Sequence, residues 1–336
     1  MFPKMNLPRI TLVTPSFQQA DFLEETIKSV LSQNYPNLEY IVIDGGSTDG
    51  SIDIIKKYAA QLSYCESCED RGQSHAINKG WQRATGDLIG WLNSDDLLLP
   101  NALYEVAAAF EANPKVSLVY AGNLIFGAGF KSYVDRGTRK NFEIENLARM
   151  NLPQQSAFYR RKVIEEQGFL DESLHYCMDF DLFIRIFLNY ELAEADGVWA
   201  AFRQHKKSKT NTMLMGFFAD NQKIMSRLLR SFDHTKDLIP TMKSLNLYVK
   251  ENTKYSVSRP YSKKDIHQAW LLYLEEVATA LRYDLQYDWL KRILKYLKKN
   301  HLEFYTQSKK IKRVRLLRHV PVFFILFFRK IKQIFE

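Results

Sequence analysis

The first 120 residues alternate between short apolar runs and stretches with the periodicity of a helix. Apolar runs of this length are typical of buried strands, and the periodic stretches between them are typical of helices that cover a sheet. The predicted strands are Ile10–Val13, Tyr40–Ile43, Leu62–Cys65, Leu88–Trp91 and Val116–Tyr120. The predicted helices lie around Phe22–Ser32, Gly50–Ala60, Ser74–Ala84 and Asn101–Glu111. This alternation predicts a parallel α/β sheet built from successive strand–helix units.

The pattern changes after the last of these strands. The segment Gly122–Gly137 is punctuated by glycines and predicts a hairpin, and an apolar, strand-like run ends at Arg203. Beyond about residue 210 the apolar positions take helical spacing, most clearly in Leu271–Leu281 and Trp289–Leu297. We therefore expect an α/β catalytic domain over residues 1–210 and a mainly helical region over residues 211–336.

Polar residues follow four of the predicted strands directly. The four segments are Thr14–Ser16, Asp44–Ser47, Glu69–Gly72 and Asn93–Asp96. In open α/β sheets, ligands bind beyond the carboxyl ends of the strands, so these loops are expected to form one site. Three of them carry carboxylates, which are the ligands that Mg²⁺ and Mn²⁺ prefer.

Charge is distributed unevenly along the chain. Residues 203–336 contain 29 Lys and Arg and 11 Asp and Glu, whereas residues 1–202 contain 18 and 27. A basic second half favours an anionic surface as its partner, either a membrane or a nucleic acid. The chain has three cysteines, too few for a disulfide framework, and we interpret Cys65 and Cys68 as ordinary thiols in a reducing compartment.

The pair Asp95 and Asp96 is the strongest candidate for a metal site. The two carboxylates follow an apolar strand, where they can hold a divalent cation together with phosphate oxygens. An alternative is that they only cap the helix that begins near Pro100. The glycine-rich segment Gly45–Gly50 fits neither G-x-G-x-x-G nor G-x-x-x-x-G-K-[ST], which disfavours a dehydrogenase or a P-loop enzyme.

Six ordered segments resemble the inverting glycosyltransferases of family 2, which have the GT-A fold. They are Ile10–Phe17, Val42–Gly50, Asp70–Gly80, Ile89–Asp96, Pro153–Phe158 and Met178–Leu182. The resemblance covers roughly residues 9–205. It implies a Rossmann-like mixed sheet flanked by helices, a nucleotide-sugar donor, and Mn²⁺ or Mg²⁺ as cofactor.

The resemblance also implies roles for individual residues. It implies that Asp44 accepts hydrogen bonds from the base or ribose of the donor. The full set expected at the nucleotide and donor sugar is Thr14, Pro15, Ser16, Asp44, Asp70, Gln73, Asn78 and Asp95. Asp95, Asp96 and His205 are the implied metal ligands, although a lone histidine such as His205 is often structural. Gln154 and Gln155 are expected to reach the acceptor.

Asp179 is the candidate catalytic base. An inverting transfer needs a carboxylate that removes the proton of the acceptor hydroxyl. Family members usually have Glu-Asp here, and Met178 replaces the Glu. Asp181 lies about 200° further round a helix and is expected to pair with Arg185 instead. The alternative for Asp179 is a carboxylate that only stabilises a helix start, the role we expect for Asp49 as cap of a helix near Ser51.

The C-terminal segment combines cationic and aromatic residues. Nine Lys and Arg and no acidic residue lie between Lys309 and Lys332, around the apolar core Val320–Phe328. This core is shorter than the roughly 20 apolar residues of a spanning helix, so we expect residues 309–336 to lie on an anionic membrane surface. The alternative is that they pack on the protein or on a second copy in a homo-oligomer. No secretory signal is apparent, and we expect the catalytic domain on the cytoplasmic side.

The sequence therefore predicts a metal-dependent glycosyltransferase of the hexosyltransferase type. Its expected donor is a nucleotide-diphosphate sugar, UDP-sugar by default, and its expected acceptor is a glycan or lipid-linked hydroxyl in the synthesis of surface polysaccharide or glycolipid. The alternative enzyme is a sugar-phosphate nucleotidyltransferase, which would need no base at Asp179. A nucleic-acid-binding protein is disfavoured, because the carboxylate-rich loops would repel phosphate, and no nucleic-acid partner is expected.

Overall fold

A computed structural model describes residues 7–137, 147–149, 152–205 and 214–317 of the chain. The chain divides into two compact units. The first comprises Met1–Asn141 and Asn151–Ser208, and the second comprises Phe142–Met150 and Lys209–Glu336. We call them unit 1 and unit 2.

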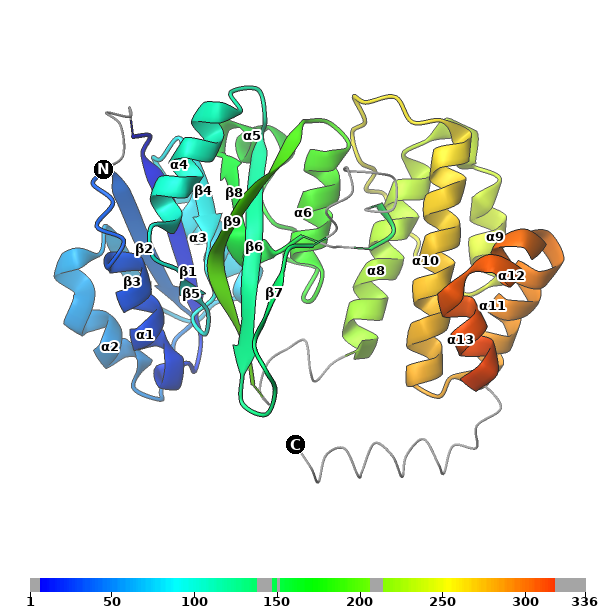
Figure 1. Cartoon of the computed structure of the whole chain (residues 1–336), viewed down its shortest axis with the longest axis horizontal. Helices are drawn as coiled ribbons and strands as arrows, with labels where there is room; N and C mark the ends of the chain where they lie inside the picture. The colour runs from blue at the N-terminus through cyan, green and yellow to red at the C-terminus, as the bar shows by residue number, and fades with distance from the viewer. Residues whose placement is uncertain (1–6, 138–146, 150–151, 206–213, 318–336) are drawn as a thin grey trace. The chain divides into compact units, whose positions relative to one another are not determined.

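Unit 1 is built on one mixed sheet with the strand order β3-β2-β1-β4-β8-β6-β9-β5, and β7 pairs with β6 (Figure 1). The first four strands in this order are parallel, and β8 is antiparallel to both of its neighbours. The strands are β1 (Ile10–Ser16), β2 (Leu38–Asp44), β3 (Tyr64–Ser67), β4 (Leu88–Trp91), β5 (Leu97–Leu98), β6 (Leu118–Gly127), β7 (Tyr133–Asp135), β8 (Ala157–Arg160) and β9 (Leu192–Gln204). The predicted α/β sheet is confirmed, with an antiparallel part that makes it mixed.

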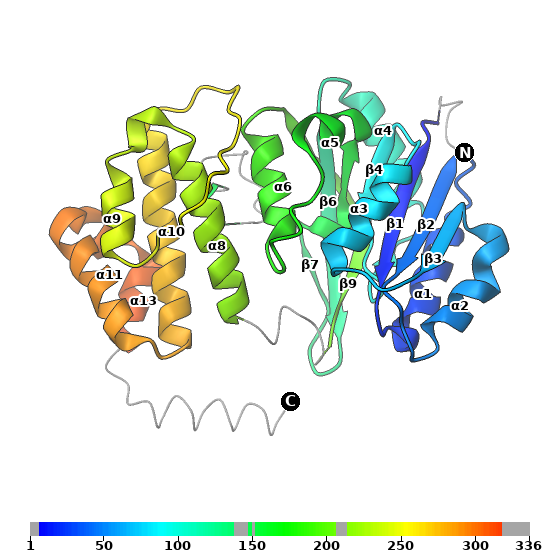
Figure 2. The same ribbon diagram turned by 180° about the vertical axis from the view of Figure 1, so that it is seen from behind.

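Helices cover both faces of this sheet. Figures 1 and 2 show α1, α2 and α4 over one face and α3, α5 and α6 over the other. Their bounds are α1 (Ala20–Leu31), α2 (Ser51–Tyr58), α3 (Gln73–Arg83), α4 (Ala102–Ala112), α5 (Arg161–Gln167) and α6 (Met178–Phe187), with short 3-10 turns at Ala59–Gln61 and Gln154–Ser156. On the second face, Gly80 of α3 lies so close to β1 that a Cβ there would come within 2.5 Å of Val13.

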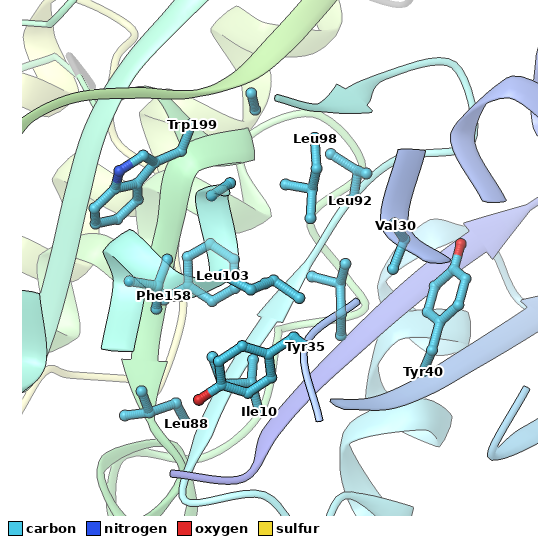
Figure 3. Close-up of a cluster of buried hydrophobic side chains, with 14 of the residues drawn as sticks. Ile10, Val30, Tyr35, Tyr40, Leu88, Leu92, Leu98, Leu103, Phe158 and Trp199 are labelled. Carbon is cyan, nitrogen blue, oxygen red and sulfur yellow. The ribbon is translucent and has the colours of Figure 1, made fainter. Parts of the chain in front are cut away.

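The core of unit 1 lies between the first helix layer and the sheet. Leu23, Ile27 and Val30 of α1 are fully buried against apolar side chains of the strands. Figure 3 shows part of this cluster, in which Tyr40 and Leu88 come from strands and Leu103 comes from α4. Burial on both faces explains why each central strand reads as a continuous apolar run.

Two predicted elements of unit 1 can be compared with the structure in detail. The predicted hairpin is confirmed, since β6 pairs with β7 in antiparallel register. The third strand begins at Tyr64 rather than at the predicted Leu62. The reason is local, because the amide of Leu62 donates a hydrogen bond to the carbonyl of Ala59 and closes a 3-10 turn.

Unit 2 consists of helices in its described part, and α8, α11 and α13 pack on α10. The helices are α8 (Leu214–Arg230), α9 (Leu238–Ser244), α10 (Lys263–Tyr283), α11 (Tyr287–Asn300), α12 (Leu302–Gln307) and α13 (Lys309–Leu317), with a 3-10 turn at Asp233–Thr235. Ser262 and Asp265 form a capping box at the start of α10. In the ranges that the structure covers, none of the helices has the length and apolarity needed to cross a bilayer.

Candidate active site

The loop Asn93–Asp96 follows β4 and is hydrogen-bonded to a side chain of α1. The hydroxyl of Thr26 donates to the carbonyls of Ser94 and Asp96, at 2.9 and 2.8 Å. Thr26 is fully buried on the same face of α1 as Leu23 and Ile27. A polar side chain on an apolar helix face therefore fixes the backbone of this loop.

Asp96 is fully buried, and the fold uses both of its carboxylate oxygens. Oδ1 accepts a hydrogen bond from the amide of Arg203 at 2.9 Å, and Oδ2 accepts one from the side-chain amide of Asn93 at 3.2 Å. Burial and the neighbouring charge of Asp95 raise the pKa of Asp96 above its usual value. The structure therefore gives Asp96 a role inside the loop and gives no support to its predicted role as a metal ligand.

Asp95 of the same loop and His205 form a partly buried pair. The Oδ2 of Asp95 lies 3.0 Å from the Nε2 of His205, and the two side chains are 17% and 16% exposed. The ring of His205 also lies 4.8 Å from the ring of Phe22. A carboxylate oxygen and an imidazole nitrogen that meet in this way can take the same cation.

Arg203 connects this pair to the rest of unit 1. Its backbone amide bonds Asp96, and its Nε donates to the carbonyl of Asp95 at 2.9 Å. Its guanidinium also pairs with Glu25 at 2.5 Å and lies 5.1 Å from the ring centre of Phe22. Arg203, a residue of β9, thus fixes the backbone of Asp95 and Asp96.

The described residues fit a divalent cation only in part. Among them, no group of three or more His, Cys, Asp and Glu side chains gathers as a complete metal site. Asp95 and His205 supply an oxygen and a nitrogen ligand, and Mg²⁺ and Mn²⁺ commonly take their remaining ligands from substrate phosphates and water. This pair therefore fits a cation that binds together with a phosphorylated ligand.

Asp44 lies at the end of β2 with its carboxylate buried. It accepts hydrogen bonds from the amides of Gly46 and Ser47, from the hydroxyl of Ser47, and from the hydroxyl of Ser67 at 2.7 Å. All of these donors belong to the chain itself. The structure thus shows Asp44 ordering the turn after β2.

Ser16 lies beside Asp44, since the two residues are register partners at the ends of β1 and β2. Its hydroxyl is buried and has no hydrogen-bond partner in the described structure. A buried hydroxyl without a partner is unfavourable unless a ligand or water completes it. Thr14 and Pro15 are also buried on β1, and the hydroxyl of Thr14 lies 3.0 Å from that of Tyr40.

Asp70 extends from the loop after β3 toward the turn after β2. Its Oδ1 accepts the amide of Gly72 at 2.7 Å. A Cβ placed on Gly45 would lie 2.9 Å from its Oδ2, so the glycine leaves space for the carboxylate. The predicted proximity of these two loops is thus observed.

Gln73 and Asn78 both lie on α3 but differ in their surroundings. The side-chain amide of Gln73 donates to Oδ1 of Asn93 at 2.7 Å, which links α3 to the Asn93–Asp96 loop. Asn78 is buried, and its amide bonds both the N–H and the carbonyl of Leu170, at 3.0 and 2.9 Å. The structure therefore gives Asn78 a role in anchoring the Leu170 loop and no support for the predicted donor contact.

Gln154 and Gln155 occupy the 3-10 turn before β8. The Nε2 of Gln154 donates to the carbonyl of Trp91, and Gln154 is buried. Gln155 accepts a hydrogen bond from Asn123 at 2.6 Å and also bonds Asp96. Gln155 therefore contacts Asp96 of the Asn93–Asp96 loop, whereas Gln154 supports the end of β4.

Asp179 lies in the first turn of α6 and is partly exposed. Its Oδ1 accepts the amide of Phe180 at 2.8 Å. Burial, and then the negative charge of Asp179, raise the pKa of Tyr159, which stacks on Trp91. Asp181 is buried and pairs with Arg185 at 2.9 Å, which confirms the predicted pairing.

One expected contact differs in the structure, and one expectation about the cysteines agrees with it. Asp49 is not the N-cap of α2, because Gly50 holds that position in a left-handed conformation. Its carboxylate instead accepts the amides of Ala20 and Ser51 and so stabilises the start of two helices. Cys65 and Cys68 are both free thiols, in agreement with the expectation that they form no disulfide.

Sequence reasoning missed several residues that hold the site. Thr26, Arg203 and Asn123 were given no role, yet they fix Ser94, Asp95 and Gln155. The signal for Thr26 is a threonine at an apolar position of an amphipathic helix. Arg203 and Asn123 gave no local signal, because their partners lie far away in the sequence.

Comparisons with known proteins give a consistent result. Residues 11–168 match the model of glycosyl transferase family 2. An uncharacterized glycosyltransferase of Rickettsia prowazekii is 26% identical over 215 residues, covering 62% of this chain and 67% of that protein. The putative teichuronic acid biosynthesis glycosyltransferase TuaG of Bacillus subtilis is 38% identical over 94 residues, covering 26% of this chain and 36% of TuaG.

Two solved structures share the fold. S. aureus TarS 1-349, in complex with UDP-GlcNAc, has a TM-score of 0.56 at 15% identity, with 92% of this chain and 90% of that chain covered. The mannosyltransferase PcManGT from Pyrobaculum calidifontis, in complex with GDP-Man and Mn²⁺, has a TM-score of 0.55 at 18% identity, with 87% and 76% covered.

Proposed function

The chain belongs to glycosyl transferase family 2 and has the GT-A fold, and from this we propose that it transfers a sugar from a nucleotide-diphosphate sugar to a hydroxyl group. The transfer inverts the configuration at the anomeric carbon and contributes to the synthesis of surface polysaccharide or glycolipid. The name of TuaG and that of the O-antigen biosynthesis protein RfbC of Myxococcus xanthus support this setting. UDP-GlcNAc in TarS and GDP-Man in PcManGT support a nucleotide-sugar donor, with UDP as the favoured nucleotide.

The contact between Asp95 and His205 is the observation on which this proposal rests most. Two side chains with metal-binding atoms meet beside the carboxyl end of β4, where α/β sheets bind ligands. We assign both to the Mn²⁺ or Mg²⁺ that accompanies the donor, and the Mn²⁺ in PcManGT supports this choice of metal. When bound, such a cation neutralises charge on the departing diphosphate.

The residues around this pair prepare the donor site. Thr26 and Arg203 hold the loop backbone and so fix the position from which the Asp95 side chain would meet the donor. The unpartnered hydroxyl of Ser16 is available to the nucleotide at the end of β1. Asp70 lies on the loop after β3. Gly45 leaves space for its carboxylate, and the amide of Gly72 donates a hydrogen bond to it.

We assign the role of base to Asp179. The acceptor hydroxyl loses its proton to the carboxylate as its oxygen attacks the anomeric carbon opposite the leaving diphosphate. Asp179 is partly exposed, in contrast to Asp181, which is buried against Arg185. The two carboxylates of this helix thus have different surroundings suited to different roles.

The C-terminal residues are proposed to contact a membrane. The predicted apolar core Val320–Phe328 lies outside the described residues. The preceding helix α13 is described, and its Ile311 and Val314 are buried within unit 2. Residues 309–317 therefore pack on the protein, and we restrict the proposed membrane segment to residues 318–336. Deleting residues 318–336 should release the protein from phosphatidylglycerol vesicles without unfolding it, whereas unchanged vesicle binding would contradict the proposal.

The proposed reaction can be tested with a panel of nucleotide sugars. The full chain is incubated with each UDP- and GDP-sugar and Mn²⁺, and the release of nucleoside diphosphate is measured, with Asp95→Ala as the control. Release that depends on Mn²⁺ and on Asp95 is the expected result. Release of pyrophosphate from a nucleoside triphosphate and a sugar phosphate would instead identify a nucleotidyltransferase.

A further inference from the structure

The β6–β7 hairpin presents three exposed apolar side chains. Phe130, Tyr133 and Val134 are 38%, 54% and 47% exposed. Apart from Phe17, they are the large apolar side chains of unit 1 that are exposed in its described part. The rings of Phe130 and Tyr133 are 6.4 Å apart and tilted by 55°. Such clustering of apolar side chains on one surface element is typical of a binding site.

The hairpin is held firmly at its base. Arg136 donates hydrogen bonds to the carbonyls of Asp196 and Gly197 on β9, the second at 3.1 Å. The amide of Gly137 donates to the carboxylate of Asp135 at 2.9 Å. β6 and β7 pair in regular antiparallel register, with Asn123 opposite Asp135 and Ile125 opposite Tyr133. The two rings are therefore presented on an ordered support, which lowers the entropy cost of binding.

The register of β6 with β9 places the tip of the hairpin beside the proposed metal site. Phe126 pairs with Arg203, and Gly127 pairs with Gln204, the residue before His205. The ring of Phe130 lies over Gly127, where an added Cβ would be 3.1 Å from the ring and 2.2 Å from the carbonyl oxygen of Gln204. Figure 1 shows this tip projecting beyond the end of β6.

We propose that Phe130 and Tyr133 form an acceptor subsite that binds a neutral sugar ring. This inference rests on the proposed function, because an acceptor sugar must approach the donor near Asp95 and His205. One face of a pyranose ring consists mainly of C–H groups, which pack on the faces of aromatic rings. Exposed Lys131 and Ser132 lie between the two aromatics and offer polar groups to the ring hydroxyls. These polar groups favour a sugar ring over a purely apolar surface as the occupant.

The test compares acceptor use with donor use in the full-length protein. The double variant Phe130→Ala/Tyr133→Ala is assayed with methyl glycosides of glucose, galactose, mannose and N-acetylglucosamine as acceptors. Loss of two aromatic contacts should raise the acceptor KM about tenfold. Donor affinity and the slow release of nucleoside diphosphate without acceptor should stay unchanged. Tyr133→Phe should behave like the wild type, and Tyr283→Ala, an exposed aromatic of unit 2, is the matched control.

Other outcomes would overturn the assignment. An unchanged acceptor KM in the double variant would exclude the subsite. Loss of vesicle binding or of self-association, with acceptor KM unchanged, would assign the hairpin to a membrane or to a second copy. If the wild type releases no nucleoside diphosphate at all, the proposed function fails. Saturation-transfer NMR with the same methyl glycosides then tests the subsite alone: a signal lost in the double variant supports it, and no signal in the wild type overturns it.

Discussion

Asp95 and His205 are 110 residues apart in the chain, yet Oδ2 of the first lies 3.0 Å from Nε2 of the second. The contact follows from the sheet. Leu97 pairs with Ala201 and Leu98 with Ala200, so β5 and β9 bring the residues on either side of them together. The pair is therefore a product of tertiary structure, and its two members should act as one unit.

Removing either member should weaken binding of the cation. We expect Asp95→Asn and His205→Ala each to raise the Mn²⁺ concentration needed for half-maximal stabilisation by UDP about tenfold or more, a typical loss for a metal-site residue. Thermal shift titrations of Mn²⁺ in the presence of UDP measure this. His234→Ala, at an exposed histidine of unit 2, serves as the control, and a Mn²⁺ dependence identical to the wild type would remove the pair from the metal site.

Replacing the proposed base should separate catalysis from binding. Asp179→Asn keeps the shape of the side chain but cannot take a proton, so transfer should fall about 10²- to 10⁴-fold while donor affinity is kept. Asp181→Asn on the same helix breaks a buried ion pair with Arg185 and should lower stability instead, by about 3 kcal/mol. Steady-state kinetics and urea unfolding distinguish the two variants. Full activity of Asp179→Asn would exclude it as the base.

Thr26→Val should show that the conformation of the Asn93–Asp96 loop depends on α1. The change keeps the volume but leaves the carbonyls of Ser94 and Asp96 without their buried donor. The expected loss is about 1–3 kcal/mol of unfolding free energy, together with weaker donor binding. Urea unfolding and donor titration measure the two effects. Thr26→Ser restores the hydroxyl and should recover both, and a Thr26→Ser variant as impaired as Thr26→Val would contradict this role.

Glu24 should make the stability of unit 1 depend on pH. Hydrogen bonds from Lys57, Tyr58 and Lys28 lower the pKa of Glu24 from its usual 4.5 to about 2. Because the folded-state pKa is depressed, the carboxylate stabilises the fold fully above pH 4.5, and this contribution is lost as the pH falls from 4.5 through 2. Glu24→Gln should thus lower the Tm at pH 7, and the difference from the wild type should shrink below pH 4.5.

Thermal unfolding of both proteins at pH 7, 5, 4 and 3 checks this expectation. Asp53→Asn is the control, since Asp53 is highly exposed and its ion pair with Lys56 is 3.8 Å long. A Tm difference between Glu24→Gln and the wild type that stays constant over this pH range would show that the carboxylate acts in some other way.

The sheet could be predicted because its strands are buried on both faces. The run Leu88–Trp91 was predicted with the bounds that the structure has, since it is a short, mainly apolar run between Asp87 and the polar residues that begin at Asn93. The loops at the carboxyl ends of the strands could be identified for the same reason. The antiparallel strand β8 was not predicted, because its four residues follow a loop and carry no alternating pattern.

The division of roles within the site could not be predicted. Nothing in the sequence separates Asp95 from Asp96, because their difference arises when the amide of Arg203 bonds one of them. Likewise, Asn78 looks like a site residue until Leu170, 92 positions later, pairs with its amide. Local patterns locate the loops, and distant partners decide which side chains stay accessible.

The loop that carries Asp95 is shaped by groups other than those that give it chemistry. Thr26 and Arg203 hold its backbone, whereas the side chain of Asp95 contacts His205. A relative that lost both Asp95 and His205 could therefore keep the same loop conformation and the same fold while lacking the proposed cation ligands. If the proposed metal site is correct, structural similarity alone would not separate active homologues from inactive ones, and the residues at positions 95 and 205 would.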